Sequence, residues 1–373
     1  MEPLGDDSAA ELVDPLDRSL SQQFVTFAAT SARRAPLYST LATGIAGEPS
    51  LFRLLLHAPS EQQQPVLLFA CTHHLLLDEP RSELAQWYPN LTRDPRRPDD
   101  PALMATFRRF VESRVTELTW LLSTRTTQTN EVGRCGLFLP VFGLLADEVG
   151  TLGQIDIGTS GGLNLLLDRY EYRYRGENDP TSQVRSVGGP SSVVLEVSTR
   201  GDVPVPDTMP VIGARVGIDR LPVDVSDPIE SRWLEACVWP DQADRFHRLR
   251  AAIELATIAR PRVRSGDAIA GLRTAVAEVG TRCHPVVTNS WVLNYLTPTQ
   301  RVAYVNGLDE IGTRRDLSWV FAESPALVPE IPVDDDLVGS DVTAVTLVRW
   351  RDGIRSSQTL AVCHPHGYWI HWR

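Results

Sequence analysis

The sequence predicts an α/β protein in which an all-helical domain precedes a mostly parallel sheet. From about residue 150 onward, apolar strand-like runs alternate with helical patterns, as in parallel sheets with helices on both faces. Before residue 125, helical periodicity is the only strong pattern. Thr297-Pro298 combines a helix cap with a first-turn proline. Near the C-terminus, two apolar runs flank Asp352-Gly353, which predicts an antiparallel hairpin.

Composition and charge indicate a globular protein without membrane helices. The chain has 373 residues, of which 42% are hydrophobic and 22% charged, values typical of globular proteins. The net charge of −11 makes a long nucleic-acid duplex an unfavourable partner, because phosphate binding needs a basic face. Five scattered cysteines without a CxxC pattern indicate reduced thiols, so we expect a cytoplasmic protein. No apolar run reaches the roughly 20 residues that a membrane helix needs.

We expect two domains, a helical cap over 1–125 and an α/β domain over 126–373. The clearest element of the cap is a long amphipathic helix over 99–122. The loop-rich stretch 171–210 is expected to be an insertion in the α/β domain. Tyrosines and arginines alternate along 169–175. This pattern fits either a twisted edge strand with a polar face or a lip that holds an anionic or planar substrate.

The stretch over residues 151–170 organises the α/β domain. It is read as a buried strand, a glycine turn and an amphipathic helix. Gly158, Gly161 and Gly162 let the backbone bend sharply and approach a ligand. A helix that began there would direct free N–H groups toward the crevice above the sheet, where open α/β folds bind cofactors. The alternative is a strand-to-helix turn without a ligand.

The turn has the pattern Asp-x-Gly-x-x-Gly-Gly. It resembles the first motif of class I S-adenosylmethionine-dependent methyltransferases. Asp156, Gly158 and Gly162 match the acidic, first and third glycine positions of that motif, and Ser160 stands where its middle glycine usually is. The resemblance implies a Rossmann-like, seven-stranded sheet with an antiparallel C-terminal hairpin, and S-adenosylmethionine as cofactor.

Two further acids follow predicted strands. Asp219 could accept hydrogen bonds from both ribose hydroxyls, because a carboxylate has two acceptor oxygens. In the methyltransferase pattern, Asp267 and the neighbouring Ala268 would meet the adenine ring. Asp219 lies much farther from the glycine turn than the roughly 20 residues of a dinucleotide fingerprint, so the 171–210 insertion must account for the difference. If that insertion formed the second strand, Asp219 would lose its role. The ordinary alternative for both acids is helix capping.

A polar cluster and a second motif supply candidates for binding and chemistry. Residues 287–290 match the fourth methyltransferase motif, where the methyl acceptor usually lies. The cluster at 125–131 precedes a predicted helix, and its alternative role is capping and a solvated turn. The candidate substrate contacts are Arg125, Asn130 and Trp291, and the candidate catalytic residues are Glu131, as general base, and Asn289.

Segments along most of the chain resemble a mainly actinobacterial family known as domain of unknown function 2332. They cover residues 66–89, 128–134, 161–165, 217–219, 239–242, 266–267, 289–291 and 364–367. The more usual His-Ser-Trp of the family stands here as Asn-Ser-Trp at 289–291. This resemblance implies kinship and no particular activity.

We therefore expect an S-adenosylmethionine-binding methyltransferase that acts on a small molecule. The alternatives are an NAD(P)-dependent oxidoreductase and a non-catalytic, methyltransferase-like module that binds a protein. We expect no metal, because neither His73-His74 nor the pair His364 and His366 is joined by cysteines or carboxylates at ligand spacing. The sequence does not decide between a monomer and a homo-oligomer.

Overall fold

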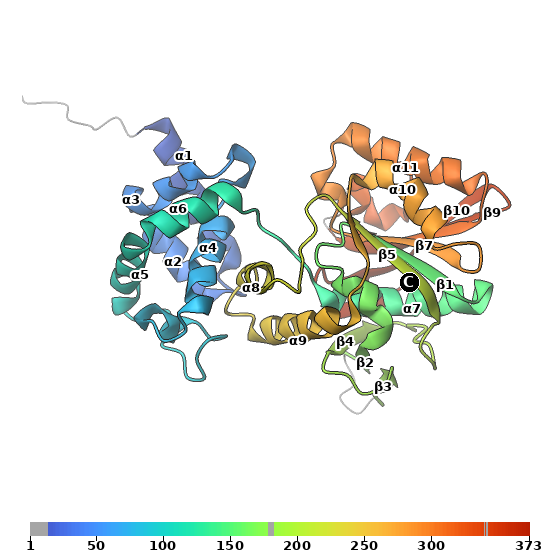
Figure 1. Ribbon diagram of the computed structural model, residues 1–373, viewed down its shortest axis with the longest axis horizontal. Helices are drawn as coiled ribbons and strands as arrows, with labels where there is room; N and C mark the ends of the chain where they lie inside the picture. The colour runs from blue at the N-terminus through green and yellow to red at the C-terminus, as the bar shows by residue number, and fades with distance from the viewer. Residues whose placement is uncertain (1–13, 178–182, 339, 341) are drawn as a thin grey trace, which may run out of the picture. The chain divides into compact units, whose positions relative to one another are not determined.

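The computed structural model describes residues 14–177, 183–338, 340 and 342–373. The described residues divide into two compact units, one formed by those within 1–128 and 232–247 and one by those within 129–231 and 248–373. The first unit is helical, and the second contains the sheet (Figure 1). Residues 232–247, which were predicted to lie in the α/β domain, belong to the helical unit.

The helical unit is built from short helices, most of which begin at prolines. Its α-helices are α1 (Pro15–Ser31), α2 (Pro36–Ala46), α3 (Pro49–Phe52), α4 (Pro65–Asp78), α5 (Ala102–Ser113) and α6 (Val115–Thr124). Proline is favoured at a first helical position because the N–H that it lacks has no partner there. The single helix predicted over 99–122 is wrong: Arg114 leaves the helical conformation (φ −128°, ψ 22°) and separates α5 from α6. Its guanidinium instead binds Glu79 at the end of α4, at 2.7 Å.

Two helices cross the boundary between the units. They are α8 (Pro228–Ala236) and α9 (Ala243–Ala259), and the break predicted at Pro240 is confirmed. Trp233 of α8 is part of the core of the helical unit, and its indole N–H donates to the carbonyl of Thr126 at 2.9 Å. Asp241 accepts a hydrogen bond from the N–H of Leu37, in the first turn of α2, at 3.1 Å. These contacts explain why this segment belongs to the helical unit.

The second unit contains one large mixed sheet. The described residues give it eleven strands, so the predicted number of seven is wrong. The strands are β1 (Leu152–Ile157), β2 (Glu171–Gly176), β3 (Arg185–Val187), β4 (Val194–Arg200), β5 (Ile212–Asp219), β6 (Val263–Ser265), β7 (His284–Ser290), β8 (Leu317–Glu323), β9 (Thr343–Arg351), β10 (Ile354–Cys363) and β11 (Trp369–Trp372). Their order is β3-β2-β4-β11-β10-β9-β8-β7-β1-β5-β6.

Five neighbouring strands, β6-β5-β1-β7-β8, are parallel. From β1 the chain builds β5 and β6 on one side and later β7 and β8 on the other, so the strand order reverses between β1 and β7. The crevice outside such a reversal is where open parallel sheets bind ligands. The predicted C-terminal hairpin is confirmed as β9 and β10. Because β8, β9 and β10 are successively antiparallel, the carboxyl end of β10 lies at the same edge as those of β1, β7 and β8.

The predicted insertion over 171–210 supplies β2, β3 and β4, at the far end of the sheet. It therefore does not form the second parallel strand, which is β5. Neither alternative for 169–175 holds in full: the tyrosines are buried, which excludes a substrate-holding lip, and β2 lies between β3 and β4, one strand in from the edge. Tyr170, Tyr172 and Tyr174 donate to the carbonyls of Leu163, Leu167 and Gly136.

Helices cover both faces of the parallel strands. In Figure 1, α10 (Ala268–Glu278) and α11 (Pro298–Gly312) lie on one side of the sheet and α7 (Cys135–Val149) on the other. Ile155, Ile157, Val216 and Ile218 pack with α10 and α11 in one core cluster. Alternate residues of β5 consequently face the opposite side.

Candidate functional site

The glycine bend follows β1 directly. Gly158, Ser160 and Gly162 have φ values of +69°, +51° and +75°, so three residues of five lie in the left-handed region that glycine tolerates best. The N–H of Gly158 donates to the carbonyl of Ile218, near the end of β5, at 2.8 Å. The bend therefore lies on the carboxyl ends of the two neighbouring strands.

The carboxylate of Asp219 is hydrogen-bonded to this bend. One carboxylate oxygen accepts a hydrogen bond from the N–H of Ser160 at 2.7 Å, and the other accepts from the N–H of Leu221 at 2.9 Å. A ribose-binding role requires the acid of the neighbouring strand to lie at the bend, and the structure places it there.

Side chains of the protein occupy the space beside two of the glycines. A Cβ atom on Gly158 would lie 2.5 Å from a methyl carbon of Val292, and one on Gly162 would lie 2.7 Å from a methyl carbon of Val263. Real Cβ atoms do not come so close to other atoms. The two glycines are thus required for packing within the chain, and Gly158 leaves no room for a ligand at its Cα.

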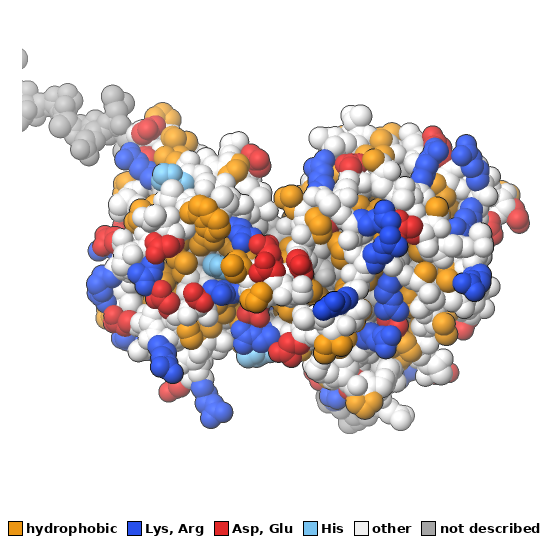
Figure 2. Space-filling view, viewed as in Figure 1, with side chains coloured by type: hydrophobic (Ala, Val, Ile, Leu, Met, Phe, Trp, Pro, Cys, Tyr) orange, Lys and Arg blue, Asp and Glu red, His pale blue; other side chains and the backbone are white. Residues whose placement is uncertain are grey.

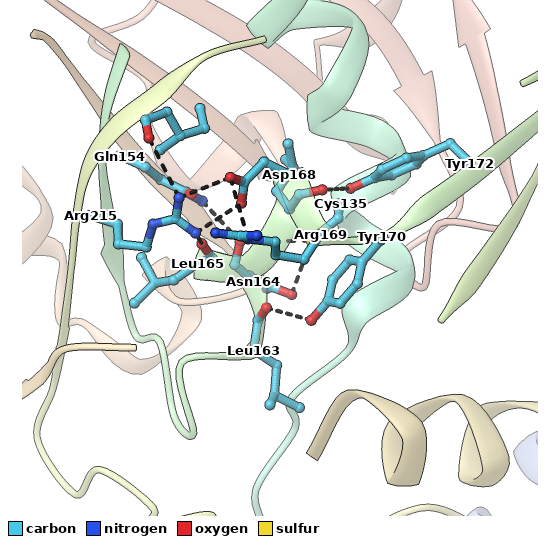
Figure 3. Close-up of polar contacts among 12 residues, drawn as sticks. Cys135, Gln154, Leu163, Asn164, Leu165, Asp168, Arg169, Tyr170, Tyr172 and Arg215 are labelled. Carbon is cyan, nitrogen blue, oxygen red and sulfur yellow. Dashed lines mark hydrogen bonds and ion pairs between the residues drawn. The ribbon is translucent and has the colours of Figure 1, made fainter. Parts of the chain in front are cut away.

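The amphipathic α-helix predicted after the bend is wrong. Residues Leu163–Arg169 form a 3-10 segment, η5, with a non-helical residue at Leu166. Figure 3 shows why: side chains from other elements bind the carbonyls that an α-helix would use. Gln154 donates to the carbonyl of Asn164 at 3.0 Å, and Arg215 donates to that of Leu165 at 3.1 Å. A ligand at this bend would consequently not face the N-terminus of an α-helix.

Asp156 is buried near the carboxyl ends of the parallel strands, in β1 next to β7. The hydroxyl of Thr288 donates to its carboxylate at 2.8 Å, so the side chain couples β1 to β7. Burial raises the pKa of the Asp156 carboxyl to about 6, although the hydroxyls of Thr159 and Thr288 oppose the rise. The acid of the predicted motif therefore faces the interior.

Asp267 is the N-cap of α10. Its carboxylate accepts from the N–H groups of Ile269 and Ala270 at 2.9 and 3.2 Å, and it lies 3.6 Å from the guanidinium of Arg220. This is the helix-capping role that the sequence left open as an alternative. Ala268 is the first residue of α10.

A buried polar cluster lies farther along the edge. The side chain of Glu131 is 3% exposed, and one carboxylate oxygen accepts from the N–H of Gly133 at 2.9 Å. The same oxygen is 3.6 Å from the guanidinium of Arg248, and the other is 3.8 Å from Nδ1 of His366. A carboxylate, a guanidinium and an imidazole in such proximity can hold a polar ligand and exchange a proton with it.

Arg134 connects this cluster to the end of β7. Its guanidinium donates to the carbonyl of Ser290 and to that of Pro365, each at 2.9 Å. Asn130 is joined to the glycine bend by its amide group, which donates to the carbonyl of Thr159 at 3.3 Å. Sequence reasoning gave no role to Arg134 or Arg248 and considered His366 only as a metal ligand. No local pattern pairs positions so far apart in the chain.

Asn289 faces the interior. It is fully buried, its amide nitrogen donates to Glu323 at 2.8 Å, and its amide oxygen accepts from the indole of Trp319 at 2.6 Å. Burial raises the pKa of the Glu323 carboxyl to about 7, against the backbone N–H of Val292 and the Asn289 amide, which lower it. Trp291, just beyond β7, has a φ of +56°, a strained value for a bulky residue.

Arg125 belongs to the helical unit, and so does the pair of consecutive histidines, His73 and His74. The Arg125 guanidinium lies 5.6 Å from the centre of the Trp233 ring. Nδ1 of His73 is 3.0 Å from the carbonyl oxygen of Ala236, and its other ring nitrogen is 2.9 Å from the Asn90 amide. Burial lowers the pKa of His73 to about 4, so the ring is neutral at pH 7. Among the described residues, no group of three or more His, Cys, Asp or Glu side chains could hold a metal ion.

Charged side chains of both signs lie on the surface (Figure 2), and the cysteine thiols are free. Basic and acidic side chains are intermixed on the visible face of both units (Figure 2). None of the five cysteines forms a disulfide in the structure. Within the described ranges, every helix is too short or too polar to cross a membrane.

Comparison with known proteins places the chain in a family. No curated protein and no solved structure matches it at a significant level. A family model with the description "Uncharacterized protein conserved in bacteria (DUF2332)" matches residues 21–372, which is nearly the whole chain. The protein therefore belongs to this bacterial family.

Proposed function

We propose that the chain binds S-adenosylmethionine and transfers its methyl group to a small molecule. The observation that carries the proposal is the 2.7 Å hydrogen bond between the N–H of Ser160 and the carboxylate of Asp219. It joins a bend rich in positive φ values to an acid of the neighbouring strand, beside the point where the strand order reverses. Open parallel sheets bind nucleotide-like ligands at this position.

The residues fit the ribose of this cofactor. Each oxygen of Asp219 accepts one backbone N–H, and each has a second lone pair with which it can accept from a ribose hydroxyl. Leu221, two residues farther on, is 63% exposed and offers apolar surface beside the acid. The fit is poorer at Gly158, where Val292 fills the room that was expected for the methionine end.

The bound cofactor supplies a methyl group on a positively charged sulfur. The protein has to align the acceptor and accept its proton. Glu131 is suited to the second task, because it directly follows Asn130, which is bonded to the bend. Arg248 stabilises the charge of this carboxylate, and His366 provides an imidazole next to it. The acceptor would then lie between the bend and the cluster around Glu131.

Calorimetric titration of the full chain with S-adenosylmethionine tests the proposal. We expect binding in the wild type and at least a tenfold loss of affinity in Asp219→Asn. This variant keeps the size of the side chain but removes its charge. Asp207→Asn is the matched control, because Asp207 is an acid of the same unit with a side chain that is 99% exposed. Folded wild-type protein that gives no heat at high micromolar ligand would contradict the proposal.

A second candidate is a non-catalytic relative that binds the cofactor without turning it over. Two observations favour it: Val292 fills the space beside Gly158, and both ends of the Asn289 amide are committed to the interior. Incubation with S-adenosylmethionine and a panel of small amines, phenols and thiols separates the candidates. A methyltransferase forms S-adenosylhomocysteine with at least one of them and loses this activity in Glu131→Gln, whereas a binding protein forms none.

A further inference from the structure

A pocket of about 430 Å³ opens beside the glycine bend, within the second unit. Its walls come from the bend, the loop after β5, the last turn of α9 and the residues that lead into β6. They include Gly161, Val223, Ala256, Thr257, Arg260 and Val263. This volume lies within the range of small-molecule sites, roughly 300 to 1,000 Å³.

The pocket lies on the same face of the sheet as Asp219. Ile218 packs against α10, whereas a Cβ atom on Gly217 would face Thr159 of the bend. Asp219 follows Gly217 by two residues, so their side chains point to the same face. Val263 pairs with Gly217 in the sheet and lines the pocket. Asp267, by contrast, caps α10 on the opposite face.

Hydrogen bonds hold the pocket walls in place. The N–H of Val223 donates to the carbonyl of Ser160 at 3.3 Å, which joins the loop after β5 to the bend. The hydroxyl of Thr257, which donates to the carbonyl of Ile253 at 2.9 Å, lies 3.3 Å from the carbonyl oxygen of Val225, so the same loop is in contact with α9. A ligand would therefore enter a site that is already formed, and little ordering would oppose its binding.

The lining suits a flat heterocycle with an amino group. Val223, Ala256 and Val263 offer apolar surface for the faces of a ring. Asp224 and Arg260 line the pocket with opposite charges, and α9 directs its carboxyl end toward it, so the Asp224 carboxylate and the end of the helix favour a hydrogen-bond donor. Arg260 ends α9 in the left-handed conformation, with a φ of +48°, and its N–H donates to the carbonyl of Ala256 at 2.7 Å.

We infer that this pocket binds the adenine ring of the cofactor, while Asp219 binds the ribose. The inference rests on the proposed function and names a subsite for it. This position of the adenine ring differs from the one at Asp267 that the methyltransferase pattern implied. The carboxylate of Asp267 already accepts two N–H groups of α10 and pairs with Arg220. The ring and the ribose then lie on one face of the sheet, next to Ser160.

Calorimetry with two probes, adenosine and S-adenosylhomocysteine, tests the inference on the full chain. Thr257→Trp fills the pocket from an exposed position of α9, and Ser226→Tyr fills it from an exposed position of the opposite wall. We expect each variant to bind both probes at least tenfold more weakly. Asp267→Ala and Thr281→Trp, a substitution at an exposed turn of the same unit, should bind within threefold of wild type. Circular dichroism confirms that each variant is folded.

The outcomes separate the pocket from the proposed function. Unchanged binding in both filled variants, or a tenfold loss in Asp267→Ala, overturns the pocket as the adenine site. Binding of adenosine without binding of S-adenosylhomocysteine or S-adenosylmethionine supports the pocket and contradicts the methyltransferase proposal. If neither probe binds to wild type, the pocket inference fails as well.

Discussion

Gly133 and Gly367 lie backbone to backbone. A Cβ atom on Gly367 would collide with the carbonyl oxygen of Gly133, and a Cβ atom on Gly133 would collide with that of His366. This contact joins the short 3-10 helix η4 (Val132–Arg134) to the loop after β10. It brings Glu131 and His366 together although 234 intervening positions of the chain separate them.

Gly367→Ala should destabilise the second unit by about 3 kcal/mol. Its φ of +78° disfavours a side chain by about 1 to 2 kcal/mol, and the collision with Gly133 adds a comparable amount. Gly353→Ala is the matched control, because its φ is +79° but its Cβ would meet only the Cα of Thr313 at 3.9 Å. We expect a loss of about 1 kcal/mol there. Urea unfolding measures both, and equal losses would show that the backbone contact is unimportant.

Asp267→Ala should lower the free energy of unfolding by about 1 kcal/mol, because it removes the side chain that caps α10. Asp267→Asn should cost much less, since an amide oxygen can accept the same two N–H groups. Thermal unfolding followed by circular dichroism compares the two variants. A loss in the asparagine variant as large as that in the alanine variant would indicate that the ion pair with Arg220 contributes more than the cap.

Wild-type protein should lose stability relative to Glu323→Gln as the pH rises from 5 to 8. Burial raises the pKa of the Glu323 carboxyl from 4.5 to about 7, so the folded state holds a proton that the unfolded state has released in this range. The expected change is about 2 to 3 kcal/mol. Glutamine can still accept from Asn289, so the comparison isolates the charge. Urea titrations at both pH values measure it, and a difference independent of pH would contradict the prediction.

His73 should produce the opposite dependence of stability on pH. Burial lowers its pKa from 6.5 to about 4, so the unfolded state binds a proton first and stability is lost as the pH falls through this range. Between pH 7.5 and 5, wild type should lose about 2 kcal/mol relative to His73→Gln. Unfolding at the two pH values, followed by tryptophan fluorescence, checks this. Parallel losses in both proteins would mean that His73 does not titrate as a buried neutral ring.

Local patterns predicted much of the fold. The cap at Thr297 appears as a capping box with Gln300, the break at Pro240 separates α8 from α9, and Asp352-Gly353 turns β9 into β10. Each of these signals depends on residues that are close in sequence, so propensity and turn chemistry are enough to identify them.

The errors come from side-chain and strand contacts that the periodicity of a single segment does not reveal. The helix after the bend was predicted from the leucines of 163–167, but Gln154, Tyr170 and Arg215 bind the carbonyls of that segment. The sequence did not show that the strands of the insertion join the main sheet, because β4 pairs with β11, which is far away in the chain. The same holds for the site: Asp219 could be predicted from a motif, whereas Arg248 and His366 reach Glu131 only through tertiary packing.

The two outermost strands of the sheet, β3 and β6, have only three residues each. Long, flat outer strands offer unpaired backbone groups to other chains and promote aggregation. An eleven-stranded sheet that ends in such short strands gives a second molecule little to pair with. The wide sheet that supports the site is therefore protected at both sides against growth into larger assemblies.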